Sequence, residues 1–298
     1  MSKIIDNTLV MSQEETYNEI VKYLSENQTP FIDKKLLKEQ IDNVINEELG
    51  IADETTNLEN IIEQKLADYI SKGVYEDNFS VETELSNLNV SFVFKNFDDE
   101  NEANLWLANE RGYDGYSYRD NTIYLSIVGI KGNINFNDLA DTIQHECTHY
   151  WEMKNMQQDL YNSDYQDVVN GIRNKNPYVS LTYSVIYYSN KNEINAFVNG
   201  SFASAMKKKT KYNGYKEFIK DNSISDVYSE LQKALKMIKS VDVENDIFFE
   251  SAAMRIGCDK YYLADFIKSA AEIGMKYLLK QVGKAYSLYV DKMKNGDV

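Results

Sequence analysis

Both histidines of this 298-residue chain lie in one short stretch, DTIQHECTHYWE (residues 141–152). His145 and His149 are four positions apart, so on a helix they lie on one face, about 6 Å from each other. Two imidazoles at this spacing can direct ring nitrogens to the same divalent ion. Glu146 would reach a water on that ion without binding the ion itself. The H-E-x-x-H spacing therefore predicts a Zn2+ site and metal-assisted hydrolysis, with Glu146 as the general base.

The residues around the histidines predict an amphipathic helix. At about 100° per residue, four apolar side chains form one stripe: Leu139, Ile143, Cys147 and Tyr150. The two histidines fall on the opposite side, with Glu152. We expect the helix to begin near Asn135 or Asn137, because asparagine is a favoured N-cap. Chance would produce this histidine spacing and glutamate roughly once in a thousand cases, so we favour a metal site over structural histidines.

A catalytic zinc has three protein ligands and one open position, and the chain has no third histidine. Glu152 lies on the right face, but its Cα is about 10 Å along the helix from His145. We therefore expect Glu152 to support the site from outside or to be solvated. Cys147, on the apolar stripe, is expected to be a small buried hydrophobe. Nothing in the sequence favours Cys258 as a ligand.

The stretch NKNEINAFVNGSFASAM (190–206) offers a better third ligand, Glu193. On a helix, Glu193 shares one face with Ala196, Phe197 and Gly200. The small residues at 196 and 200 would let a second helix pack closely and aim Glu193 at the metal. A surface glutamate on an amphipathic helix is the alternative.

Together the two motifs resemble those of the zincin metallopeptidases, in particular the glutamate-zincin branch. Its third ligand lies on a later helix in an E-x-x-A motif, which Glu193-Ile194-Asn195-Ala196 matches. The resemblance covers roughly residues 120–205. It implies that His145, His149 and Glu193 bind zinc and that Glu146 is the base. It also implies that the strand NTIYLSIVGI (121–130) forms a sheet edge that pairs with an extended substrate.

Other metallopeptidase families fit less well. Metzincins need H-E-x-x-H-x-x-G-x-x-H, and peptide deformylases need an upstream cysteine ligand, but no cysteine precedes Cys147. The aspartate-ligand branch stays open through Asp159, Asp164 or Asp167, none of which lies in a G-T-x-D context. A regulator-cleaving protease of the ImmA/IrrE type also stays open, although such proteins often carry a DNA-binding module and the acidic N-terminus is not one.

The resemblance also implies a donor beside the zinc that stabilises the developing oxyanion, often a histidine or a tyrosine. Since no histidine remains, we expect a tyrosine. The segment PYVSLTYSVIYYSN (177–190), between the two motifs, supplies four candidates: Tyr178, Tyr183, Tyr187 and Tyr188. The sequence does not select among them.

The remaining patterns predict a mainly α protein with a small β-sheet (α+β) and a zincin-like core. Apolar residues recur at helical spacing over 12–72, strands are expected at 89–97 and 121–130 with a turn at RDN (119–121), and helices dominate after 190. We therefore expect three regions. They are an acidic helical N-terminal region (1–88), a catalytic core with the sheet and the H-E-x-x-H helix (89–210), and a C-terminal helical region (211–298).

The net charge of −15 is unevenly distributed. Residues 1–110 hold 24 acidic and 8 basic side chains, whereas residues 111–298 hold 23 and 24. The acidic part is expected to be a solvated surface, with partner docking or covering of the cleft as alternatives. Nucleic acid is not expected, because phosphate binding needs a basic patch. KKKTK (207–211) is expected to be a helix end favoured by the helix dipole.

The sequence has no apolar run long enough to span a membrane and no recognisable secretory signal, so we expect a cytoplasmic protein. Two cysteines are too few for a disulfide framework. The leading hypothesis is a zinc endopeptidase or aminopeptidase that acts on proteins or peptides. The alternative is a non-catalytic helical interaction protein with a structural or vestigial zinc site, which binds a protein partner through the acidic N-terminal region.

Overall fold

A computed structural model describes residues 51–107, 115–117, 119–155 and 165–295. The chain divides into two compact units, Met1–Ala52 and Asp53–Val298, and nearly all described residues belong to the second. The helices expected between residues 12 and 50 lie outside the described residues.

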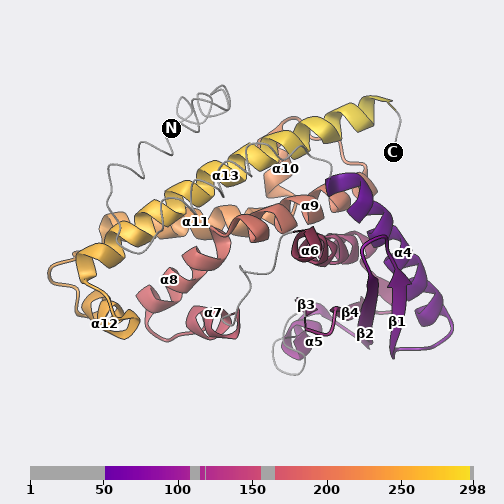
Figure 1. Ribbon diagram of the computed structural model, residues 1–298, viewed down its shortest axis with the longest axis horizontal. Coiled ribbons are helices and arrows are strands. Elements are labelled where there is room, and N and C mark those ends of the chain that lie inside the picture. Colours follow the sequence, from indigo (N-terminus) through magenta and orange to yellow (C-terminus); the bar gives the residue numbers. More distant parts are fainter. Residues whose placement is uncertain (1–50, 108–114, 118, 156–164, 296–298) are drawn as a thin grey trace. The chain divides into compact units, whose positions relative to one another are not determined.

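The second unit is mainly helical and contains one small mixed sheet (Figure 1). Its strands are β1 (Glu76–Glu82), β2 (Asn87–Phe97), β3 (Gly115–Ser117), β4 (Thr122–Ile130) and β5 (Asn133–Ile134). Its helices are α4 (Ile51–Ser71), α5 (Glu100–Trp106), α6 (Phe136–Asn155), α7 (Tyr165–Ile172), α8 (Pro177–Tyr188), α9 (Lys191–Lys208), α10 (Tyr215–Lys220), α11 (Ile224–Ser240), α12 (Ile247–Ile256) and α13 (Lys260–Asn295). This composition confirms the predicted α+β class.

The sheet has the strand order β1-β2-β4-β3, and β5 also pairs with β4. β2 and β4 are parallel, with Val90 opposite Ile123, whereas β1, β3 and β5 pair antiparallel. The turn at 119–121 folds β3 back onto the start of β4, and β5 pairs with its end, so β4 is only in part the free edge that the resemblance implied. Between Leu125 and Val128, no described strand covers the outer side of β4.

One hydrophobic core joins the sheet to α4 and α6. The four predicted stripe residues of α6 are all buried in it: Leu139, Ile143, Cys147 and Tyr150. α4 contributes Leu58, Ile62 and Leu66 to the same core. α4 and β1 lie within the predicted N-terminal region 1–88, and their buried side chains belong to the same core as those of α6.

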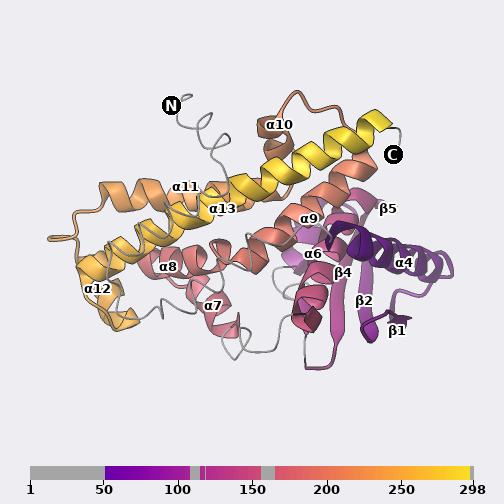
Figure 2. The same ribbon diagram turned by 45° about the horizontal axis from the view of Figure 1, so that its top comes forward.

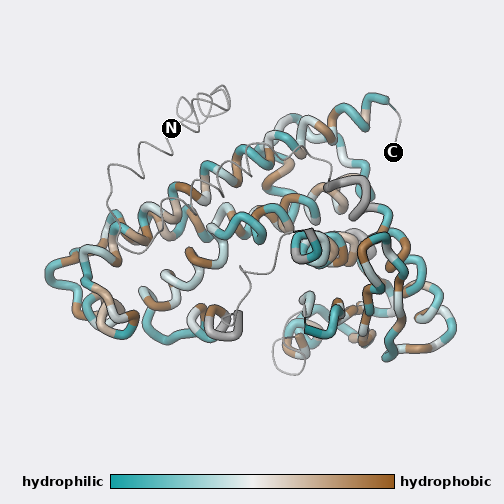
Figure 3. The backbone as a smooth tube through the Cα atoms, in the orientation of Figure 1, coloured by the Kyte–Doolittle hydropathy of each residue, from teal (hydrophilic) through white to brown (hydrophobic). Residues whose placement is uncertain are grey.

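A second core lies among α8, α9, α11, α12 and α13. α13 lies beside α9 and α11 (Figures 1 and 2), and hydrophobic segments alternate with hydrophilic ones along it (Figure 3). Its buried residues follow one another at steps of four and three, the spacing of coiled-coil seams: Leu263, Ile267, Ala271, Gly274, Leu278, Val282, Ala285 and Tyr289.

The end of α9 matches the interpretation of KKKTK as a helix terminus. α9 ends at Lys208, and Lys207 lies in its last turn, where a cation stabilises the helix dipole. The ammonium of Lys207 also lies 3.0 Å from the buried carboxylate of Glu59 on α4. This ion pair connects the end of α9 to α4, which packs on the sheet.

α6 and α9 approach each other closely at Gly200. A Cβ at this position would lie 2.2 Å from Oδ1 of Asp141 and 2.7 Å from its backbone oxygen. Only a residue without a side chain therefore allows this helix spacing, as the small residues of the second motif predicted. The contact connects the sheet core, through α6, to the helical core, through α9.

Replacing Gly200 with valine should force the two helices apart. Because the backbone oxygen of Asp141 cannot rotate away, we expect Gly200→Val to lower the free energy of unfolding by about 2–3 kcal/mol. Denaturant unfolding of the metal-free protein measures this effect. Gly115→Val is the matched control, since a Cβ there meets no atom within 4 Å. Equal stability of the two variants would contradict the close-packing account.

Candidate metal centre

The helix α6 presents the two histidines as the sequence predicted. It begins at Phe136, directly after the proposed cap Asn135, and the Leu139 amide donates to the Asn135 carbonyl. His145 and His149 lie one turn apart, with their Nε2 atoms separated by 3.1 Å. Both imidazoles therefore direct the same ring nitrogen towards one point.

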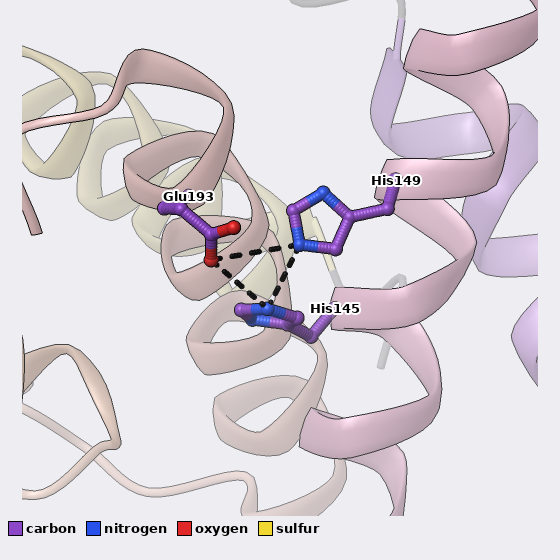
Figure 4. A group of neighbouring side chains, drawn as sticks. All are labelled: His145, His149 and Glu193. Atoms are coloured by element: carbon purple, nitrogen blue, oxygen red, sulfur yellow. Dashed lines mark hydrogen bonds and ion pairs between the residues drawn. The ribbon is translucent and has the colours of Figure 1, made fainter. Parts of the chain in front are cut away.

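The first turn of α9 brings Glu193 to that point (Figure 4). Asn190 caps the helix, since its side chain accepts a hydrogen bond from the Asn192 amide. The Glu193 Oε2 atom lies 3.7 Å from His145 Nε2 and 3.6 Å from His149 Nε2. The three residues have ligand atoms within 4.8 Å of one another and could hold a metal ion.

The charge state of Glu193 suits a cation ligand. Burial alone would raise the pKa of this carboxyl, but the neighbouring His149 and a hydrogen bond from Tyr187 hold it below its ordinary value. Its Oε2 atom is nevertheless buried without a hydrogen bond. A buried ionised oxygen without such a partner is costly unless a cation compensates it. This unsatisfied oxygen fits a bound metal ion.

His145 is held in its neutral form. Burial, reinforced by the neighbouring His149, lowers its pKa from 6.5 to about 3, although Glu193 acts in the opposite direction. The edge of the Phe197 ring packs on the imidazole, with ring centroids 4.6 Å apart. A neutral imidazole has a free lone pair, so no proton has to leave His145 before it binds a metal.

The other candidate ligands lie elsewhere. Glu152 faces Nδ1 of His149 at 3.8 Å, on the opposite side of the ring from Nε2, so it supports the histidine from behind. Cys147 is fully buried in the sheet core, and burial raises the pKa of its thiol well above the ordinary value. Cys258 is not part of the cluster. Asp159 and Asp164 lie outside the described residues.

One of the four candidate tyrosines reaches the cluster. Tyr187 donates to the Glu193 carboxylate. The Tyr188 ring packs edge-on against the Tyr187 ring, with ring centroids 4.9 Å apart. The other two are engaged elsewhere: the Tyr178 hydroxyl donates to Asp246 Oδ2 at 2.6 Å, and the Tyr183 ring packs against Gly171. Glu146, the proposed base, is buried on α6 and directly follows His145 in the chain.

Sequence reasoning missed two residues near the cluster, Asn195 and Tyr277. The Asn195 amide group donates to Glu152 Oε1 at 3.3 Å, and the Tyr277 hydroxyl donates to Asn195 Oδ1 at 2.8 Å. Asn195 stands inside the E-x-x-A motif, which is the one signal that could have drawn attention to it.

Comparison of the chain with protein-family models, with curated proteins and with solved structures found no match. None of the described helices is both long and apolar enough to cross a membrane. The function is therefore inferred from the residues of the site and their geometry.

Removal of the Glu193 carboxylate should abolish tight metal binding. We expect Glu193→Ala to weaken zinc affinity by more than about 100-fold, because losing a direct ligand exceeds the effect of losing an outer partner. Competition with a chromophoric chelator measures the affinity. Glu230→Ala is the control, since this α11 carboxylate pairs only with the exposed Lys233 among the contacts described. Equal affinity of Glu193→Ala and the unaltered protein would remove Glu193 from the site.

The protonation of His145 provides a second test. With a pKa of about 3, His145 should remain neutral in the metal-free protein from pH 7 down to about pH 4. The unfolded chain binds a proton at about pH 6.5, so folding stability should fall as the pH decreases from 6.5 towards 3. Nuclear magnetic resonance titration of the imidazole measures this directly. A midpoint near pH 6.5 in the folded protein would contradict the buried, neutral state.

Proposed function

We propose that this protein is a zinc metallopeptidase in which His145, His149 and Glu193 bind the metal and Glu146 is the general base. The main support is the convergence of the Glu193 Oε2 atom, from α9, with the Nε2 atoms of His145 and His149, both from α6. A second support is the resemblance to glutamate-zincins, in which the two motifs follow each other in the same order along the chain.

The donor set favours zinc over harder cations. Two imidazoles and one carboxylate form a common catalytic zinc site, whereas Mg²⁺ and Ca²⁺ prefer oxygen ligands throughout. The surroundings also favour a divalent cation. The Glu193 carboxyl, whose pKa is held below its ordinary value, is buried beside a neutral His145, so a positive ion would compensate its negative charge.

In the proposed mechanism, His145, His149 and Glu193 would hold a zinc ion, which when bound would supply a water nucleophile near neutral pH. The Glu146 carboxylate accepts the proton of the attacking water and returns it to the leaving amine. Tyr187 is the best-placed tyrosine to donate to the developing oxyanion, because its hydroxyl already reaches Glu193.

The proposed substrate is an extended segment of a protein or peptide. The outer side of β4 between Leu125 and Val128 is not covered by a described strand. An extended chain could add to the sheet at this place through main-chain hydrogen bonds. β4 is followed along the chain, after β5, by the histidine-bearing α6.

One observation favours a second candidate, a helical interaction protein with a structural or vestigial zinc site. The ligand side chains are only 12% (His145), 11% (His149) and 8% (Glu193) exposed, and closed sites are typical of structural zinc. In this alternative the acidic residues 1–110 bind a protein partner. A cytoplasmic location is part of both proposals.

The Glu146→Gln variant distinguishes the two functions. It retains the size of the side chain but cannot accept a proton, so we expect unchanged zinc content and a loss of peptide hydrolysis of about 10²–10⁴-fold. Mass spectrometry of a diverse peptide library measures the cleavage, with Glu230→Gln as the control. Full activity of Glu146→Gln would contradict the mechanism, and zinc binding without any hydrolysis by the unaltered protein would favour the interaction protein.

A further inference from the structure

A chain of polar contacts leads from α13, the C-terminal helix, to the far side of His149. The Tyr277 hydroxyl donates to Asn195 Oδ1 at 2.8 Å, and Asn195 Nδ2 donates to Glu152 Oε1 at 3.3 Å. The second oxygen of Glu152 lies 3.8 Å from Nδ1 of His149. Four residues from three helices thus form one continuous path to a proposed zinc ligand.

The directions of these contacts are mutually consistent. A tyrosine that donates to Asn195 fixes the orientation of its amide group, which then presents Nδ2 to Glu152. Glu152 is 1% exposed, and its Oε2 atom has no hydrogen-bond partner. This oxygen faces the ring nitrogen of His149 that must carry the proton when Nε2 binds a metal. Glu152 is therefore suited to hold that tautomer.

Close packing of α13 against the start of α9 fixes the position of Tyr277. One turn earlier, a Cβ at Gly274 would lie 2.8 Å from the Ser189 Cβ, so α13 lies very close to the segment that precedes α9. The Lys191 ammonium lies 5.8 Å from the centre of the Tyr277 ring, within the range of cation–π attraction. The start of α9, which carries Glu193 and Asn195, therefore packs against the part of α13 that carries Tyr277.

We propose that Glu152, Asn195 and Tyr277 are positioning residues that fix the tautomer and orientation of His149, which makes α13 part of the metal centre. This inference rests on the proposed zinc site but not on peptide hydrolysis. It concerns metal affinity, so it can be tested in the folded protein without any substrate.

Tyr277→Phe removes only the hydroxyl and retains the ring beside Lys191. We expect about a fivefold loss of zinc affinity, the equivalent of one hydrogen bond, with little change in the thermal unfolding of the metal-free protein. Tyr286→Phe is the matched control on the same helix, because it also loses one hydrogen bond, to the Tyr212 carbonyl. Equal zinc affinity of the two variants would overturn the role of Tyr277.

Glu152→Gln replaces the carboxyl group that faces Nδ1 with an amide and should weaken zinc binding about 10–100-fold. In the Glu152→Ala background, Tyr277→Phe should have no further effect, because the path to His149 is already broken. An unchanged fivefold effect in that background would show that Tyr277 acts by another route and overturn the proposal. Zinc binding with this pattern but without peptide hydrolysis would reject only the peptidase. Absence of zinc binding by the unaltered protein would remove the metal centre and this inference together.

Discussion

The contact between α6 and α9 is the constraint on which the candidate site depends. α6 is buried on one side in the sheet core and carries the histidines on the other, while α9 is anchored in the helical core. Gly200 lets the helices approach until its Cα lies against Asp141. Glu193 lies about two turns away on the same helix, so this packing sets the position of its backbone relative to the two histidines.

The buried charges of the same site favour the binding of a cation. Packing two helices this closely excludes water from several carboxyl groups, and the nearby His145 is itself held neutral by burial. Such an arrangement is unfavourable for an empty protein and favourable for one that holds a divalent cation. The stability of the helix pair and the affinity for a metal are therefore expected to be coupled. The contacts behind His149 extend this coupling to α13.

Local periodicity made most of the site predictable. The stripe on α6, the shared face of the histidines and the small residues of α9 all follow from 3.6 residues per turn, which can be counted along the sequence. The Glu193 ligand needed one further step, namely that Gly200 permits a close helix pair. The expectation that Glu152 supports the site from behind also agrees with its position opposite Nδ1 of His149.

Features that depend on distant parts of the chain were not predictable in this way. The sequence did not predict β1, because EDNFSVE is mostly polar and only Phe79 and Val81 are buried. The covering of β4 by β3 depends on a turn whose sequence does not fix which strand becomes the edge. The contact between Asn195 and Tyr277 spans 82 positions, and no pattern links them. Among four tyrosines, only the packing of α8 against α9 distinguishes Tyr187.

X-ray absorption at the zinc edge tests the central claim most directly, because it reports the atoms around the metal. We expect only nitrogen and oxygen ligands at about 2.0–2.2 Å, with the outer scattering of two imidazoles. When Glu193 is replaced by alanine, the number of nitrogen and oxygen neighbours should fall while the outer scattering of the two imidazoles remains. Sulfur at about 2.3 Å, or a spectrum that is unchanged without the Glu193 carboxylate, would contradict a metal held between α6 and α9.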